Sequence, residues 1–183
     1  MQCAAVLFMT VLTTAAAQVS FSIPFTEIPF TMQPMVVLMA GMALGPRLGM
    51  ASQILYLIAG VAGLPVFAVS PTLPPGAARL LGPTGGYLLS YPLAAFITGW
   101  LAARGFDKRY WTSAVAMLVG LVTIYAFGIV WLGLLAPAIG HSQTPGLRAA
   151  FVAGVVPFAL WDVMKIALAS GIMPGLWRLL GRK

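Results

Sequence analysis

The chain of 183 residues contains little charge, and most of that charge is of one sign. Only three residues are acidic, against ten lysines and arginines, and charged residues make up 7% of the total. In a soluble domain about a quarter of the residues are usually charged. The low charged fraction of this chain, together with 61% hydrophobic residues, excludes a soluble domain. The basic residues are scattered among loops, which argues against a nucleic-acid partner. The sequence therefore predicts an integral membrane protein.

Cysteine and histidine occur once each. A lone Cys3 excludes an internal disulfide and a multi-cysteine metal site, and we interpret it as a small apolar side chain. His141 lacks cysteine or carboxylate neighbours, which makes it poor evidence for a metal or for catalysis. An intramembrane enzyme would also need a nucleophile or a metal cluster at the depth of Asp162, and the sequence supplies neither. We expect no enzymatic activity and no cofactor.

The apolar runs are long and do not alternate, which favours membrane-spanning helices over a barrel. The sequence thus predicts an all-α six-transmembrane-helix bundle that forms one membrane domain over residues 1–183. The approximate spans are 3–22, 34–45, 48–64, 85–103, 111–136 and 158–179. The first run has the apolar core of a signal peptide but lacks a basic n-region, so we interpret it as a span.

The basic residues also predict the orientation, because lysine and arginine are enriched on cytoplasmic loops. With the N-terminus inside, seven basic residues face the cytoplasm: Arg47, Arg104, Lys108, Arg109, Arg178, Arg182 and Lys183. Only Arg79 and Arg148 face outward. Both termini are then cytoplasmic, and the proline-rich loops IPFTEIPFTMQP and LPVFAVSPTLPPGAARLLGPTGG are external. These loops are unusually apolar, so they either form a lid over the bundle or lie in the headgroup region.

The segment GPTGGY, residues 82–87, has the glycine content of a phosphate-binding loop but not its pattern. No lysine and Ser/Thr follow at the required spacing, and no strand precedes it. Gly85 and Gly86 instead permit close backbone approach to a ligand or to a neighbouring helix. The chain therefore cannot power active transport itself, and any ATP must be hydrolysed by a partner.

Asp162 and Lys165 lie three residues apart in the apolar run FALWDVMKIALASGIM, so they share one helix face. Each charge at bilayer depth costs roughly 2.5 to 3.5 kcal/mol, so a helix keeps such residues when they bind something or pair with each other. On the predicted topology they lie on the same side as the two proline-rich loops. We expect an outward-facing pocket for a small solute, although a purely structural ion pair would also remove the insertion cost.

Several motifs, in order, resemble the BioY family, the biotin-specific S components of energy-coupling factor (ECF) transporters. They are IPFTEIPFTMQ, AGMALGPRLGMASQILYLIAGVAGLPVF, GPTGGYLLSYPLAAFITG and PFALWDVMKIALA. The resemblance implies a six-helix protein of a prokaryotic plasma membrane that binds biotin from outside. It also implies docking on a transmembrane coupling protein that carries two ABC-type ATPases. The family's site uses the loops after spans one and three, with an aspartate and a lysine that match Asp162 and Lys165.

The resemblance suggests a role for each candidate side chain at the charged end of this site. Lys165, aided by Arg79, would suit the biotin carboxylate, while Asp162 would accept hydrogen bonds from the ureido N–H groups. Thr31 and Gln33 either bind the ureido group or cap the second helix.

The other candidates are aromatic or lie in the first loop. Tyr87 and Tyr91 either form an apolar wall against the thiophane ring and valeryl chain or anchor the membrane interface. Glu27 is interpreted as a solvated loop charge.

Two alternatives remain at this point: an S component for another small anionic vitamin, and a structural membrane subunit. The docking surface is also open. Small residues at four-residue spacing on the first helix occur as Thr10 with Thr14 and as Ala16 with Ser20.

Overall fold

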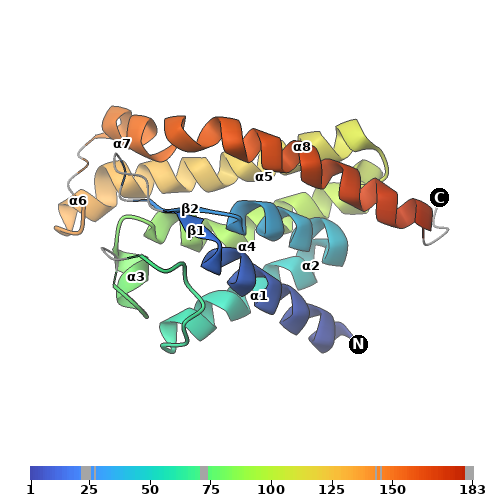
Figure 1. Cartoon of the computed structure of the whole chain (residues 1–183), viewed down its shortest axis with the longest axis horizontal. Coiled ribbons are helices and arrows are strands. Elements are labelled where there is room, and N and C mark those ends of the chain that lie inside the picture. The colour runs from blue at the N-terminus through green and yellow to red at the C-terminus, as the bar shows by residue number, and fades with distance from the viewer. Residues whose placement is uncertain (22–25, 27, 71–73, 143, 145, 180–183) are drawn as a thin grey trace.

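The computed structural model describes residues 1–21, 26, 28–70, 74–142, 144 and 146–179. It is a bundle of helices with one small two-stranded sheet (Figure 1). The helices are α1 (Gln2–Gln18), α2 (Gln33–Val61), α3 (Ala78–Leu81), α4 (Gly85–Leu101), α5 (Tyr110–Val130), α6 (Ala136–Ala138), α7 (Leu147–Gly154) and α8 (Val156–Leu179). Two π-helical turns, η1 (Ala102–Phe106) and η2 (Trp131–Leu135), extend α4 and α5. Strands β1 (Ser20–Phe21) and β2 (Phe30–Thr31) pair antiparallel.

The helix α2 consists of two segments that meet at Gly45, where φ is 79° and ψ is 178°. A Cβ added to Gly49 would lie 2.7 Å from the Cα of Gly41. Residues eight positions apart in a straight helix are separated by roughly 12 Å, so the chain must reverse direction between them. The reversal falls between the predicted segments 34–45 and 48–64, and Pro46 follows it directly.

Four helical stretches in the described part of the chain are long and apolar enough to cross a membrane. They are Gln33–Val61, Gly85–Phe106, Tyr110–Ala138 and Val156–Gly175, while α1 is a shorter apolar helix. Large apolar side chains such as Leu160 and Leu168 are exposed on the outside of the bundle, as in proteins surrounded by lipid. The predicted class, a helical membrane bundle, therefore agrees with the structure at this level.

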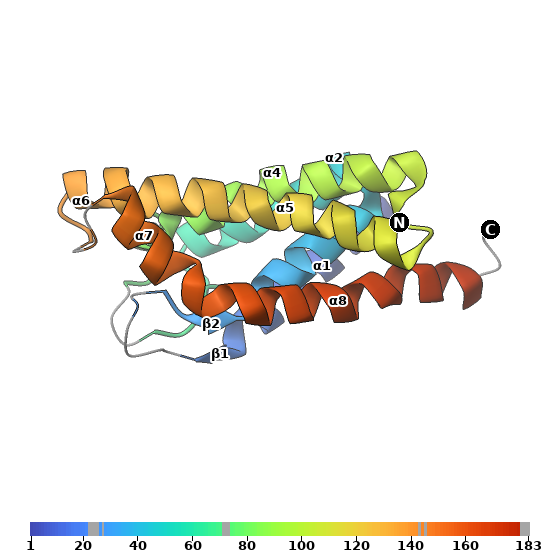
Figure 2. The same ribbon diagram turned by 90° about the horizontal axis from the view of Figure 1, so that it is seen from above.

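The elements around the candidate site gather at one end of the bundle. Figure 1 and Figure 2 show the start of α1 and the end of α8 at one end, and α6, α7 and the β1–β2 pair toward the other. Strand β2 leads directly into α2, so pairing with β1 fixes the entry to that helix.

The helix α1 packs on α2 through polar contacts, and these contacts use part of the surface that was predicted for docking. The Thr10 hydroxyl donates to the Ser52 carbonyl at 2.9 Å, and the Gln53 amide donates to the Thr13 hydroxyl at 3.3 Å. Thr10 and Ala16 are buried, so neither Thr10 with Thr14 nor Ala16 with Ser20 forms an exposed small-residue face.

Candidate functional site

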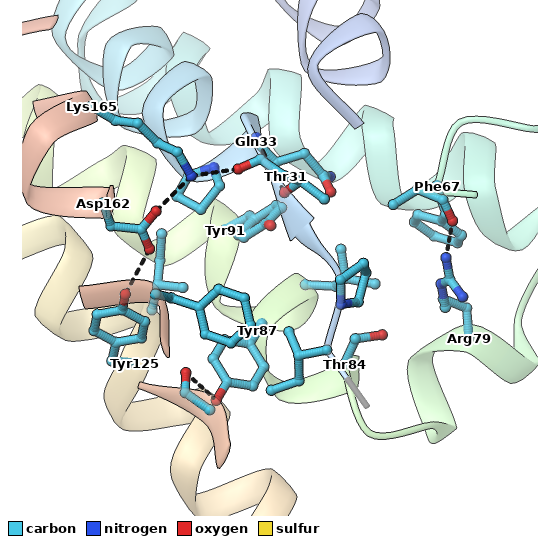
Figure 3. A pocket seen from close by; sticks show the side chains of 18 residues that line it. Thr31, Gln33, Phe67, Arg79, Thr84, Tyr87, Tyr91, Tyr125, Asp162 and Lys165 are labelled. Atoms are coloured by element: carbon cyan, nitrogen blue, oxygen red, sulfur yellow. Dashed lines mark hydrogen bonds and ion pairs between the residues drawn. The ribbon is translucent and has the colours of Figure 1, made fainter. Parts of the chain in front are cut away.

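A cavity of about 610 Å³, counting its mouth, lies between the β2–α2 entry, the loop before α4, and helices α4, α5 and α8 (Figure 3). The structure brings together seven of the nine predicted site residues in its lining: Thr31, Gln33, Arg79, Tyr87, Tyr91, Asp162 and Lys165. Most of the remaining lining is apolar, which suits the hydrophobic part of a ligand.

The charged pair on α8 forms one wall of this cavity. Lys165 Nζ lies 2.7 Å from Asp162 Oδ1, and both residues are nearly buried, at 6% and 5% exposed. Lys165 also donates to the Thr31 carbonyl at 2.7 Å, and its ammonium lies 3.7 Å from the centre of the Phe30 ring. The i, i+3 spacing thus brings the pair together as the sequence suggested, and Lys165 connects α8 to β2.

The second carboxylate oxygen of Asp162 has a partner that the sequence analysis missed. Tyr125 on α5 donates its hydroxyl to Asp162 Oδ2 at 2.6 Å and lines the same cavity. Tyr125 lies 37 residues from Asp162 inside a long apolar run, so only tertiary packing joins them. The Tyr125 hydroxyl is a polar group within an apolar span, and this is the one feature of the sequence that could have indicated a buried hydrogen-bond partner.

Thr31 and Gln33 interact mainly with their own surroundings. The Thr31 hydroxyl accepts a hydrogen bond from the Gln33 backbone N–H at 3.3 Å, at the first residue of α2. The Gln33 amide donates to the Tyr56 hydroxyl at 2.7 Å, which in turn donates to the Val66 carbonyl at 3.2 Å. Both side chains therefore stabilise the entry to α2 while they line the cavity.

Arg79 lies on α3, in the loop before α4, and is only 4% exposed. Its Nη2 donates to the Ala68 carbonyl, whereas Nη1 has no hydrogen-bond partner among the described residues. The Thr84 hydroxyl, also in the lining, is likewise buried without a partner in the described part of the chain. Burial lowers the pKa of the Arg79 guanidinium from its ordinary value, and the nearby Tyr56 opposes this shift.

The tyrosines of α4 lie in the cavity wall and are buried, which is not the position of interfacial anchors. Tyr87 donates to the Gly154 carbonyl at 3.2 Å, and the Tyr91 ring lies 6.5 Å from that of Tyr56. Both rings therefore offer apolar faces to the cavity.

Gly85 and Gly86 do not belong to the described lining of the cavity. They pack closely on the end of α5 and on η2. A Cβ at Gly85 would collide with the Leu80 carbonyl of α3 and lie 2.9 Å from a ring carbon of Trp131. A Cβ at Gly86 would meet the Trp131 side chain and lie 2.6 Å from the Phe127 carbonyl oxygen of α5. The Trp131 indole N–H also donates to the Gly82 carbonyl at 2.9 Å. Of the two readings of GPTGGY, the structure shows close approach to a neighbouring helix.

Both proline-rich loops contribute to the cavity. Ile28 and Pro29 come from the first loop, and Phe67 and Ala68 from the second. Ile28, Phe67 and Ala68 are buried, so the described parts of the loops fold over the bundle. Glu27, interpreted above as a solvated charge, lies outside the described residues.

Comparisons with known proteins agree on one family. The family model described as the BioY family matches residues 1–182. A probable biotin transporter BioY of Pyrococcus horikoshii is 42% identical over 158 residues, which cover 86% of this chain and 85% of that one. A biotin transporter BioY of Thermotoga maritima is 37% identical over 150 residues, covering 81% and 80%.

The structural comparison leads to the same family. The crystal structure of the S component for biotin from an ECF-type ABC transporter matches with a TM-score of 0.83 and 25% identity. The match covers 97% of this chain and 90% of that chain. The sequence resemblance is thus confirmed by both kinds of comparison, and the chain belongs to the BioY family.

Proposed function

We propose that the chain is the biotin-binding S component of an ECF-type ABC vitamin importer. It captures biotin in an external pocket and delivers it inward when docked on a transmembrane coupling protein with two ABC-type ATPases. The relatives named as biotin transporters and the likeness to an S component for biotin support this proposal. The role is that of a transport subunit and not of an enzyme, so ATP hydrolysis belongs to the partner subunits.

The observation that carries the proposal is the charge balance of the cavity. Its described lining holds two buried cations, Arg79 and Lys165, against one acid, Asp162. A buried charge without a partner is strongly unfavourable, so a site with one excess positive charge favours a ligand with one negative charge. Biotin has a single carboxylate, and the same balance disfavours a cationic vitamin.

The lining also offers groups for the neutral parts of biotin. Asp162 accepts from the ureido N–H groups, and Thr31 and Gln33 offer polar atoms at the same end. The rings of Tyr87 and Tyr91 cover the thiophane ring and valeryl chain. Gly85 and Gly86 serve the site indirectly, because their packing on η2 sets the position of α4.

The same proposal includes the arrangement in the membrane. The chain crosses a prokaryotic plasma membrane six times, with α1 and both segments of α2 among the crossings. Both termini are cytoplasmic and the proline-rich loops are external. The seven-to-two distribution of basic residues supports this orientation. So does the position of the start of α1 and the end of α8 at the same end of the bundle (Figure 1).

Calorimetric titration of biotin into the detergent-purified chain tests the proposal, beside the Lys165→Ala variant and with thiamine as a cationic control. We expect saturable biotin heat from the parent, severe loss in the folded variant, and no thiamine heat. A folded parent without biotin heat, and with a melting temperature that biotin leaves unchanged, would refute the biotin assignment. Binding of another anionic vitamin by that protein would then support the first alternative.

A structural subunit is the second candidate, because an Asp162–Lys165 ion pair at 2.7 Å offsets the cost of both buried charges within the protein. If the role is purely structural, Lys165→Ala would reduce the amount of folded protein in the membrane, and no vitamin would bind the parent. The two measurements together separate a receptor from a purely structural role.

A further inference from the structure

A cluster of exposed cations lies outside the cavity lining, where α4 turns into α5. Four residues form this basic patch: Arg47, Arg104, Lys108 and Arg109. All four are exposed, and none of them forms an ion pair within the described part of the chain. Figure 1 and Figure 2 show the turn from α4 to α5 at the end of the bundle that holds the two termini. Four positive charges thus gather there without acidic partners among the described residues.

Arg47 comes from α2 and joins the patch through packing. A Cβ added to Gly99 would lie 2.5 Å from the Pro46 nitrogen, so the reversal of α2 packs directly on α4 just before η1. Arg47 follows Pro46, and Trp100 follows Gly99. The Arg104 guanidinium in turn lies 3.1 Å from the centre of the Trp100 ring. Tertiary packing therefore brings Arg47 close to the cations of the α4–α5 turn.

Asp107 is the acid that stands between these cations in the sequence. Its Oδ2 accepts a hydrogen bond from the Trp177 indole at 2.7 Å, which directs the carboxylate toward the end of α8. Four cations less this one acid leave the patch with a net charge of +3. The patch therefore attracts anions even when Asp107 is counted.

Hydrogen bonds fix the backbone of the turn that carries these charges. The hydroxyls of Thr112 and Ser113 both donate to the Phe106 carbonyl, at 2.8 and 3.0 Å. The Lys108 N–H donates to the carbonyl of Gly105 at 3.3 Å, and Gly105 has a φ of 89°, which glycine adopts without strain. An anion that binds here meets an ordered turn, so less conformational entropy is lost on binding.

Exposed aromatic rings flank the basic patch. Trp100 is 45% exposed and Trp111 is 78% exposed, and the Trp111 ring packs edge-on against Tyr110 at 5.1 Å. Tryptophan and tyrosine are enriched at the boundary between headgroups and acyl chains, and arginine and lysine extend from there to the headgroups. Exposed tryptophans beside cations match a molecule with an apolar chain next to an anionic group. A soluble acidic partner would need the charges alone.

We propose that the basic patch binds the headgroup of an anionic phospholipid. Arg104, held against Trp100, and Lys108 bind the phosphate, and the acyl chains lie against Trp100 and Trp111. In the proposed arrangement this lipid belongs to the cytoplasmic leaflet, whose surface is negative. The inference goes beyond the proposed function, because it does not depend on what the cavity holds.

Phosphatidylglycerol and phosphatidylcholine with the same acyl chains test the proposal, because they differ in net charge. The dissociation constant of a single bound molecule of each is measured by native mass spectrometry of the detergent-purified chain without biotin. We expect the parent to bind phosphatidylglycerol more tightly. Arg104→Gln and Lys108→Gln should each weaken phosphatidylglycerol about fivefold, the effect of one cation near an anionic surface, and leave phosphatidylcholine unchanged.

Three further variants separate charge from apolar contact and from general effects. Asp107→Asn removes the local negative charge while its amide oxygen still accepts from Trp177, so it should tighten phosphatidylglycerol binding. Trp111→Leu should weaken both lipids alike, because it changes an apolar contact and no charge. Arg148→Gln is the matched control: it removes the same charge from an exposed position on α7, outside the patch, and should change neither constant.

The contrary results are equally specific. Equal constants for the two lipids in the parent would overturn the proposal and leave the patch to an acidic protein partner. A preference that survives the double substitution of Arg104 and Lys108, or that Arg148→Gln lowers as much, would also overturn it, because the lipid would then bind elsewhere or respond to net charge alone. If Arg104→Gln does not fold, judged by its melting temperature without lipid, Lys108→Gln decides by the same criterion.

Discussion

Replacement of Tyr125 by phenylalanine tests whether the Asp162 carboxylate must be held in place for binding. The change removes one oxygen and keeps the ring that lines the cavity. The lost hydrogen bond is short, at 2.6 Å, and its acceptor is charged. Such bonds contribute about 1.5–3 kcal/mol, so their loss as an orienting contact can weaken a dissociation constant by at most about 10- to 150-fold. Without it, Asp162 Oδ2 is free to turn toward Lys165 and away from the ligand.

Displacement titration with radiolabelled biotin measures this effect, and Tyr87→Phe is the matched control. Tyr87 lines the same cavity, but its hydroxyl donates to a neutral carbonyl at 3.2 Å, a bond that contributes only about 0.5–1.5 kcal/mol. We expect Tyr125→Phe to weaken biotin binding by up to about 150-fold and more than the control does. In an Asp162→Asn background the same change should have little further effect, because the two residues act through one contact. Additive effects of the two substitutions would refute the reasoning.

Three further predictions concern stability, measured as thermal unfolding of the ligand-free chain in detergent. Lys165→Met should destabilise the protein by about 3–5 kcal/mol, because it leaves a buried carboxylate without its cation. The same change should cost much less in an Asp162→Asn background. An unchanged melting temperature in the single variant would contradict this. Gly86→Ala should lower the melting temperature, because the added Cβ meets η2. Gly171→Ala should not, because the nearest neighbour of its added Cβ lies at 4.0 Å. Equal effects of the two substitutions would show that close packing at η2 is unimportant. Gly45→Ala should lower the free energy of unfolding by about 1–3 kcal/mol through backbone strain alone, since φ is 79° and no atom lies within 4 Å of the added Cβ. Full retention of stability would argue against this strain.

Much of the helical arrangement could be predicted from the sequence because lipid requires long apolar runs. The predicted segments 85–103, 111–136 and 158–179 correspond to α4, α5 and α8 with their π-helical extensions. The Asp162–Lys165 pair was also predictable, since helix geometry places residues i and i+3 on one face. Helix spacing and the length of an apolar run depend only on residues that are near each other in the sequence, so both can be read without the tertiary structure.

Contacts between elements were beyond such rules. Tyr125 meets Asp162 across 37 residues, and the Thr84 hydroxyl is buried without a hydrogen-bond partner in the described part of the chain, which depends on tertiary packing alone. The buried face of α1 was equally hidden, because lipid-facing and core-facing positions are both apolar and leave little amphipathic pattern. The short strands around residues 20 and 31 gave no signal either, since two residues cannot show a period.

In the proposed membrane arrangement, the reversal at Gly45 would set how deeply the cavity lies in the bilayer. The first segment of α2, residues 33–44, has twelve residues and rises roughly 18 Å, whereas the hydrocarbon core is about 30 Å thick. If the proposed arrangement places this turn at one membrane surface, Gln33 lies roughly 12 Å below the other. In that arrangement, a solute that reaches Gln33 would have passed below the headgroups and lost most of its hydration shell. Its polar groups must then exchange water for protein partners at that depth, so departure requires rehydration as well as a route past the loops.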